Sequence, residues 1–374
     1  MYVSPKNYFK PFQLLTQASL SSYSNIQVSV SLINVCFAHE FFQTFSNTNT
    51  GFSFFLFNPN SYIQKYVIRI LWMVPIYSIQ SWLSLRFHDS SLYIEASRDL
   101  YEAYVLASFL YFIIELLGGD ESLKQQLRRK APGYGDHKGL LGKLISPWGG
   151  DEFLLQCKYG VLQYVVLKVV LTFITMILET TGTYGAGEFT FAKGYIYIAF
   201  VGNISQMWAL YVLIKLYFAV EADLVSPVNW KPVGKFLCVK GVVFFTWWQG
   251  VFIAFLQSQG LIRQRGDWDS DDIANGLQDY LICVEMLFFA IAHTYTFSYT
   301  EYTSLINNGD DAVISGDAYG FMTQTAPQGS TFREALWNSS VPHEITTDIK
   351  HLARGTKNYE SRKKGGEEIT TASV

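Results

Sequence analysis

Apolar residues along this chain gather into long runs separated by polar loops. A helix must offer about 20 largely apolar residues to cross a hydrocarbon layer about 30 Å thick, because lipid cannot hydrogen-bond to exposed backbone groups. Pro75 lies inside the first run and predicts a kink there. Six runs meet the length requirement and predict transmembrane helices: Tyr66–Phe87, Tyr101–Leu117, Tyr159–Leu178, Tyr195–Val220, Phe236–Gln259 and Tyr280–Tyr299.

The regions before and after these six runs differ from them in character. The apolar run Ile26–Phe57 is interrupted by polar residues such as Asn34 and Glu40, so it makes a poor seventh helix. The C-terminal region is polar and charged, which predicts a disordered tail. We therefore predict an all-α, multi-pass transmembrane helical bundle with six clear helices and a doubtful seventh at the N-terminus. Three regions follow: residues 1–61 with a degraded or absent first helix, the helical domain 62–302, and the tail 303–374.

Composition supports a membrane environment and excludes several function classes. The chain is 49% hydrophobic and 16% charged, which is too few charges to cover a soluble globule of 374 residues. A net charge of −3 provides no basic field for nucleic acid. The sequence shows no catalytic signature and no recognisable cluster of metal ligands. We expect no enzyme activity, no nucleic-acid partner, no cofactor and no metal.

The basic residues predict how the helices are oriented. The loop between the second and third runs holds Lys124, Arg128, Arg129, Lys130, Lys138 and Lys143, whereas the loop between the third and fourth runs offers only Lys193. Because Lys and Arg collect in cytoplasmic loops, the first of these loops should face the cytosol. The same count places the C-terminus in the cytosol. The resident membrane, plasma membrane or endomembrane, stays open.

Polar residues inside the apolar runs are the candidate functional groups. In the third run, Tyr164, Lys168, Thr172, Thr175 and Glu179 recur on one face of a helix. A charge near the bilayer centre costs roughly 2.5 to 3.5 kcal/mol on insertion scales, so such groups should turn away from lipid. The candidate pathway residues are Glu115, Lys168, Glu179, Asn203, Gln206, Gln249, Glu285 and His293.

Two interpretations of these residues stand side by side. In one they line a polar pathway between helices, with Lys168 attracting an anionic group and Glu285 with His293 coupling protons. In the other they bond to one another and fix helix packing, an interaction worth only about 0.6 kcal/mol on average. Arg98 and Glu102, four residues apart, are interpreted as a local ion pair. Lys240 is interpreted as a side chain that extends to the membrane interface.

Five fragments, in this order and spacing, resemble one known family. They are YVIRILWMVPIYSIQSWLSLRF, RDLYEAYVLASF, CKYGVLQYVV, PVGKFLCVKGVVFFTWWQG and LICVEMLFFAIAHTYTFSY. The stretch Tyr62–Tyr302 is similar to the family of transmembrane protein 184 and organic solute transporter subunit alpha. The chain departs from the family pattern at Gln80, where an acidic residue is usual, and at Thr294, where a second histidine is usual. The chain therefore lacks, at these two positions, the titratable groups that the family usually has.

The resemblance implies seven helices and a cytosolic C-terminus, in agreement with the charge distribution. One branch of the family moves organic solutes, including bile-acid and steroid conjugates, by facilitated diffusion with a small single-span partner. The branch that this chain resembles more is linked to endomembrane trafficking and signalling. We predict facilitative transport of amphipathic organic anions, steroid- or lipid-like solutes, with a single-span partner subunit or self-association. The alternatives are a membrane scaffold or receptor without transport, and a lipid-handling protein.

Overall fold

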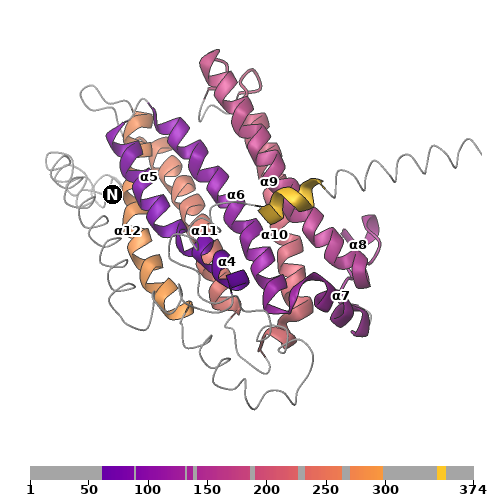
Figure 1. The fold of residues 1–374 in the computed structure, drawn as a ribbon. Helices are drawn as coiled ribbons and strands as arrows, with labels where there is room; N and C mark the ends of the chain where they lie inside the picture. The colour runs from indigo at the N-terminus through magenta and orange to yellow at the C-terminus, as the bar shows by residue number, and fades with distance from the viewer. Residues whose placement is uncertain are drawn as a thin grey trace, which may run out of the picture. The chain divides into compact units, whose positions relative to one another are not determined.

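The computed structural model describes residues 61–87, 90–130, 133–137, 141–185, 190–225, 232–262, 270–297 and 343–350. The apolar run Ile26–Phe57 lies outside these residues. Helices make up the regular structure of the described residues, which contain no strand, so the predicted all-α class is confirmed. The helices, shown in Figure 1, are α4 (Ser61–Leu71), α5 (Met73–Arg86), α6 (Ser91–Leu116), α7 (Gly119–Arg129), α8 (Leu141–Leu144), α9 (Gly150–Thr180), α10 (Tyr195–Val225), α11 (Pro232–Ser258), α12 (Ser270–Thr296) and a short helix over 343–350.

Four described helices are long and apolar enough to cross a membrane: the spans are Gly150–Thr180, Tyr195–Leu224, Val233–Gln257 and Ile273–His293. The number rises to five if α6 and α7, which are bent by 70° at a short break, count as one span. The first predicted span, in which the sequence predicts a kink at Pro75, is divided between α4 and α5.

Proline chemistry explains the division between α4 and α5. The two helices are separated at Trp72, three residues before Pro75. In a continuous helix the nitrogen of Pro75 would face the carbonyl of Leu71, but proline has no N–H and its ring clashes with that carbonyl. The regular bonding resumes with Ile76, whose N–H donates to the Trp72 carbonyl at 3.1 Å. The predicted kink is therefore a break between two helices.

Two glycines make the sharp bend between α6 and α7. Gly118 and Gly119 have φ angles of 86° and 84°, in the left-handed region that other residues rarely adopt. The N–H of Gly118 donates to the Glu115 carbonyl at 3.1 Å and closes α6. The bend carries α7 away from the direction of α6, and α7 then packs against the start of α9.

Large apolar side chains project outward from the long helices. On a protein surrounded by water such contiguous apolar surface would be unfavourable, but it is the expected surface of a helix in lipid. More than half of each of the following side chains is exposed: Phe173, Ile177, Phe200, Met207, Phe218, Phe252, Phe255 and Phe288.

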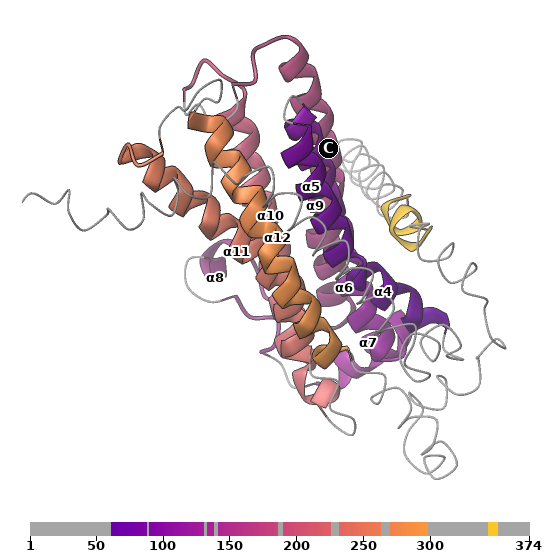
Figure 2. The ribbon, with the colours of Figure 1, turned by 90° about the vertical axis from the view of Figure 1, so that its left-hand side faces the viewer.

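The chain forms two compact units, described here separately. Unit 1 contains α5, the first part of α6, α11 and α12. In both views α11 and α12 run side by side (Figures 1 and 2). They are antiparallel: a Cβ on Gly234 would lie 2.5 Å from Thr296 Cγ2, while at the other end Gln257 donates to Ser270 at 3.4 Å. Small residues let two membrane helices approach closely, and Gly234 does so here.

Unit 2 contains α4, the second part of α6, α7 to α10 and helix 343–350. Gly160 of α9 packs against Val212 of α10, where a Cβ would lie only 2.6 Å from a valine methyl. Nearby, the Ser205 hydroxyl donates to Gln163 Oε1 at 3.0 Å. The predicted polar face of α9 turns inward over Tyr164, Thr172 and Thr175, which are buried.

One segment of the C-terminal region, residues 343–350, is described by the structure. The sequence predicts disorder over 303–374, yet residues 343–350 form a helix held against unit 2. Asp348 of this helix and Asp120 of α7 both contact Lys158 of α9. The helix therefore lies near α7, with which it shares the contact to Lys158. Which side of the membrane this end faces stays a prediction.

Candidate functional site

The candidate site is a set of polar side chains inside unit 1, which we call the unit 1 polar layer. Its members come from three helices: Arg98 and Glu102 from α6, Lys240 and Gln249 from α11, and Asp279, Glu285 and His293 from α12. From Asp279 to His293, at 1.5 Å per helical residue, the layer extends over about 21 Å. That is a large part of a hydrocarbon core about 30 Å thick.

Arg98 and Asp279 form a buried ion pair. Arg98 Nη1 lies 3.2 Å from Asp279 Oδ1, and their side chains are only 9% and 4% exposed. The same nitrogen donates to the Ser81 hydroxyl of α5 at 3.0 Å. These contacts join α5, α6 and α12 at one point. Because each charge would be costly alone in a membrane helix, the pair compensates both.

Lys240 is paired more loosely. Its ammonium lies 3.8 Å from Glu102 Oε1, too far for a hydrogen bond, and both side chains are nearly buried. Among the described residues Lys240 Nζ has no hydrogen-bond acceptor. A buried ammonium without an acceptor loses much of the solvation that water would provide. It is therefore a place where the oxygen of an anionic group or a water molecule would be stabilised.

Gln249 and Glu285 lie in direct contact, the amide of Gln249 donating to Glu285 Oε1. The remaining oxygens, Gln249 Oε1 and Glu285 Oε2, are buried and have no partner within the described part of the chain. The sequence predicted both residues as pathway residues, and the structure brings them together.

His293 is completely buried in α12. Its Nδ1 lies 2.7 Å from the Phe289 carbonyl, so Nδ1 carries a proton and donates to it. The ring stacks on Phe297 with centroids 5.6 Å apart. Nε2 finds no partner in the segments that the structure describes. Within the described residues, His293 bonds to Phe289 and Glu285 bonds to Gln249, so the structure does not join the two groups that the sequence predicted would couple protons.

The other five predicted residues belong to unit 2. Glu115, Lys168 and Gln206 are partly buried, and Glu179 and Asn203 are exposed. Asn203 Nδ2 donates to the Ala199 carbonyl at 2.8 Å, so its amide is partly satisfied within its own helix. Their part in a pathway stays a prediction.

The sequence did not predict that Arg98, Glu102, Lys240 and Asp279 belong to the unit 1 polar layer. It paired Arg98 with Glu102, whereas the structure pairs Arg98 with Asp279 and Glu102 with Lys240. It placed Lys240 toward the interface, but its side chain is 11% exposed. The available signal was that Arg98, Lys240 and Asp279 all border or interrupt apolar runs, where a charge requires a partner. No group of His, Cys, Asp or Glu side chains among the described residues could hold a metal ion.

Comparison with known proteins identifies relatives over more than half of the chain. Residues 33–302 match the sequence profile of the family described as Organic solute transporter Ostalpha. The match begins upstream of Tyr62, within the interrupted apolar run. The chain is 37% identical over 254 residues to Protein LAZ1 homolog 1 of Arabidopsis thaliana, an alignment that covers 64% of this chain and 51% of that protein. The chain thus spans about half the length of this curated relative. No solved structure was found to match.

Proposed function

The chain belongs to the organic solute transporter alpha family, and from that premise we propose that it carries amphipathic organic anions across a membrane by facilitated diffusion. It is an integral membrane protein with several membrane-spanning helices. Transport of this kind requires no covalent chemistry. The substrate would be an apolar, steroid- or lipid-like body with a single anionic group.

The observation that carries the proposal is the buried ammonium of Lys240. It has a carboxylate 3.8 Å away and no hydrogen-bond acceptor among the described residues. A solute anion could satisfy it and leave again, because Glu102 would take over part of the compensation once the solute departs. Gln249, Glu285 and His293 offer further polar atoms that have no partner in the described part of the chain. A site that binds an anion without holding it irreversibly is what a facilitative carrier requires.

Flux of androsterone sulfate into proteoliposomes tests the proposal. We expect saturable uptake that is accelerated by unlabelled solute on the opposite side, as for a carrier. Lys240→Met should raise the half-saturating concentration roughly tenfold or more, because a hydrogen bond to a charged group contributes about 1.5–3 kcal/mol. The matched control is Lys215→Met, which makes the same substitution outside the unit 1 polar layer. Lys215 of α10 contacts the carbonyl of Asp136 in a loop. Uptake no greater than in empty liposomes would refute transport.

A membrane scaffold that signals through its tail is the second candidate, and helix 343–350 favours it. This helix is held by side chains of unit 2, so a partner could compete for it. Removal of residues 305–374 separates the two candidates. A carrier retains anion flux after the deletion, whereas a scaffold loses partner recruitment and has no flux to retain. The same flux measurement after co-expression with a single-span partner would show whether a second subunit is needed.

A further inference from the structure

A basic and aromatic cluster of unit 2 lies outside the unit 1 polar layer. Two tyrosines form its centre: the rings of Tyr66 and Tyr111 stack with centroids 6.1 Å apart. The Lys65 ammonium and the Arg69 guanidinium lie 4.9 and 5.3 Å from the centre of the Tyr66 ring. The Lys158 ammonium lies 5.5 Å from that of Tyr111. We call these five residues the basic groove.

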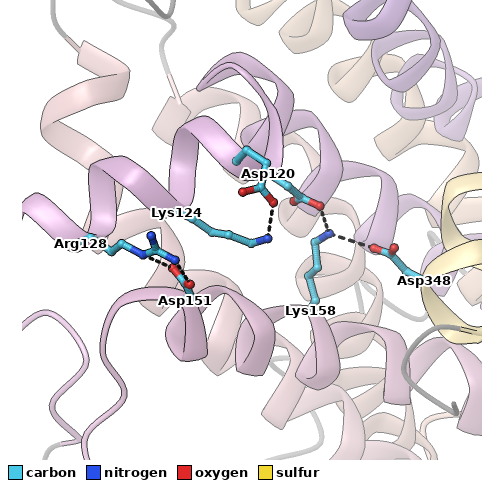
Figure 3. A network of polar contacts seen from close by, with 7 residues as sticks. Asp120, Lys124, Arg128, Asp151, Lys158 and Asp348 are labelled. Atoms are coloured by element: carbon cyan, nitrogen blue, oxygen red, sulfur yellow. Dashed lines mark hydrogen bonds and ion pairs between the residues drawn. The ribbon is translucent and has the colours of Figure 1, made fainter. Parts of the chain in front are cut away.

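Helix 343–350 occupies the basic groove. Glu344 pairs with Lys65 and lies 3.4 Å from Arg69. One turn later, Asp348 accepts hydrogen bonds from the Tyr111 hydroxyl at 2.8 Å and from Lys158 at 2.9 Å. Figure 3 shows Lys158 between Asp348 and Asp120 of α7.

The helix places an apolar group between its two anionic contacts. Ile345 is 3% exposed, whereas most of the helix is partly or fully exposed. Glu344 and Asp348 are four residues apart and therefore project from one face of the helix. The basic groove thus holds two carboxylates, and an aliphatic side chain of the same helix is buried next to one of them in the sequence. This is the chemistry of an amphipathic anion, supplied by the protein itself.

Side-chain contacts with unit 2 hold helix 343–350 in place. Glu344 contacts Lys65 and Arg69, and Asp348 contacts Tyr111 and Lys158. Three of these four partners are cations. A ligand that competes for these cations would release the helix.

We propose that the basic groove is an anion-binding site for amphipathic organic anions and that helix 343–350 is its tethered, displaceable occupant. The solute's sulfate or carboxylate would take the place of Asp348 on Lys158 and Tyr111, and its apolar body would take the place of Ile345. The identity of the solute rests on the proposed transport function. The site itself rests on the contacts of the basic groove.

Hydrogen–deuterium exchange of the full chain in phosphatidylcholine nanodiscs tests this proposal. We expect saturating androsterone sulfate to accelerate amide exchange in 345–350 at least tenfold, while neutral androsterone leaves it unchanged. Unchanged exchange with androsterone sulfate overturns the proposal. Release of the helix in phosphatidylserine nanodiscs, without added androsterone sulfate, would also overturn it. The anionic group that displaces the helix would then belong to a lipid and not to a solute.

Variants identify the contacts that are responsible. Lys158→Met should leave 345–350 in fast exchange with no further response to androsterone sulfate. Lys124→Met is the matched control, because Lys124 pairs with Glu121 in the same region without contacting the helix (Figure 3). Its exchange should match that of the wild type.

A change confined to the tail avoids any effect on bundle folding. Glu344→Gln with Asp348→Asn should free the helix and tighten androsterone sulfate binding about tenfold or more, because the tethered competitor is removed. Equal binding before and after this change would contradict the proposal. Flux measured on the same preparations separates the two hypotheses. Flux with unchanged exchange means that only the groove assignment is wrong, whereas release of the helix without flux means that only transport is wrong.

Discussion

The guanidinium of Arg98 lies 3.2 Å from the carboxylate of Asp279, and both side chains are almost fully removed from solvent. The two residues are 181 positions apart in the chain. Their pairing fixes α6 against α12 in unit 1 and compensates two charges that would each be costly inside a membrane.

Breaking this pair should destabilise the protein strongly. Arg98→Met or Asp279→Asn leaves one buried charge uncompensated, which typically costs about 3–5 kcal/mol. The double change Arg98→Met with Asp279→Asn should cost less than the sum of the single changes. Thermal unfolding in detergent micelles measures these differences.

The exposed pair Arg128–Asp151 provides the control for this experiment. Its side chains are 62% and 44% exposed, so solvent already compensates both charges. Arg128→Met with Asp151→Asn should leave the unfolding midpoint unchanged. Strictly additive effects at Arg98 and Asp279 would show that the pair has no coupling in the folded protein.

The close approach of α9 and α10 makes Gly160 sensitive to any side chain. A Cβ there would lie 2.6 Å from one methyl of Val212 and 3.0 Å from the other. Because valine in a helix has one strongly preferred rotamer, it cannot turn away, and Gly160→Ala should lower the unfolding midpoint. At Gly202 of α10 a Cβ would be in ordinary contact with Leu171 at 3.6 Å. Gly202→Ala should be neutral or stabilising, and an equal effect of both changes would contradict this packing.

Sequence patterns predicted the helices well because lipid imposes a strict length and composition on them. Gln249 and Glu285 were recognisable as polar residues inside apolar runs. Their contact requires only that consecutive helices pack antiparallel. The partner of Arg98 was not predictable, because a local rule favours Glu102 four residues away, whereas the chain fold supplies Asp279.

Helix 343–350 was not predicted from the sequence for a similar reason. Its sequence is polar, and its stability comes from cations that are distant in the chain, Lys65 being 279 positions from Glu344. The inward turn of α9 was predictable over Tyr164, Thr172 and Thr175. Periodicity does not show where along the helix the polar face ends, and Glu179 is exposed.

The docking of helix 343–350 should be insensitive to pH over the physiological range. Burial opposes ionisation of Glu344, but the hydrogen bond and charge of Lys65, with the charge of Arg69, outweigh it and lower its pKa below the ordinary value. Glu115 is another charged group that interacts with Glu344. Between the lowered pKa of docked Glu344 and the ordinary pKa of the released residue, the docked state binds fewer protons than the released state. Docking is fully stabilised above about pH 4.3, the ordinary pKa of glutamate, and weakens as pH falls through the lowered pKa.

Hydrogen exchange of 345–350, corrected for the intrinsic effect of pH, measures this dependence. Protection should be constant from pH 8 to 5.5 and decline in stronger acid. Glu344→Gln should remove the contribution of this group to the decline. Loss of protection near pH 6.5 would implicate a different titrating group.

Lys168 of α9 was predicted to attract the anionic group of the solute. Lys168→Met keeps the length of the side chain and removes its charge, so anion flux should fall while the unfolding midpoint is preserved. Normal flux would remove Lys168 from the pathway and leave Lys240 as the proposed contact.

The central claim is that a solute and water reach the unit 1 polar layer, and cysteine accessibility at position 285 tests it most directly. In a variant without native cysteines, Glu285→Cys should react with a charged, water-soluble thiol reagent, and androsterone sulfate should slow the reaction. Ile282→Cys, at a position with 0% exposure one turn earlier in α12, should not react. An unreactive cysteine at 285, or one that androsterone sulfate does not protect, would contradict the account.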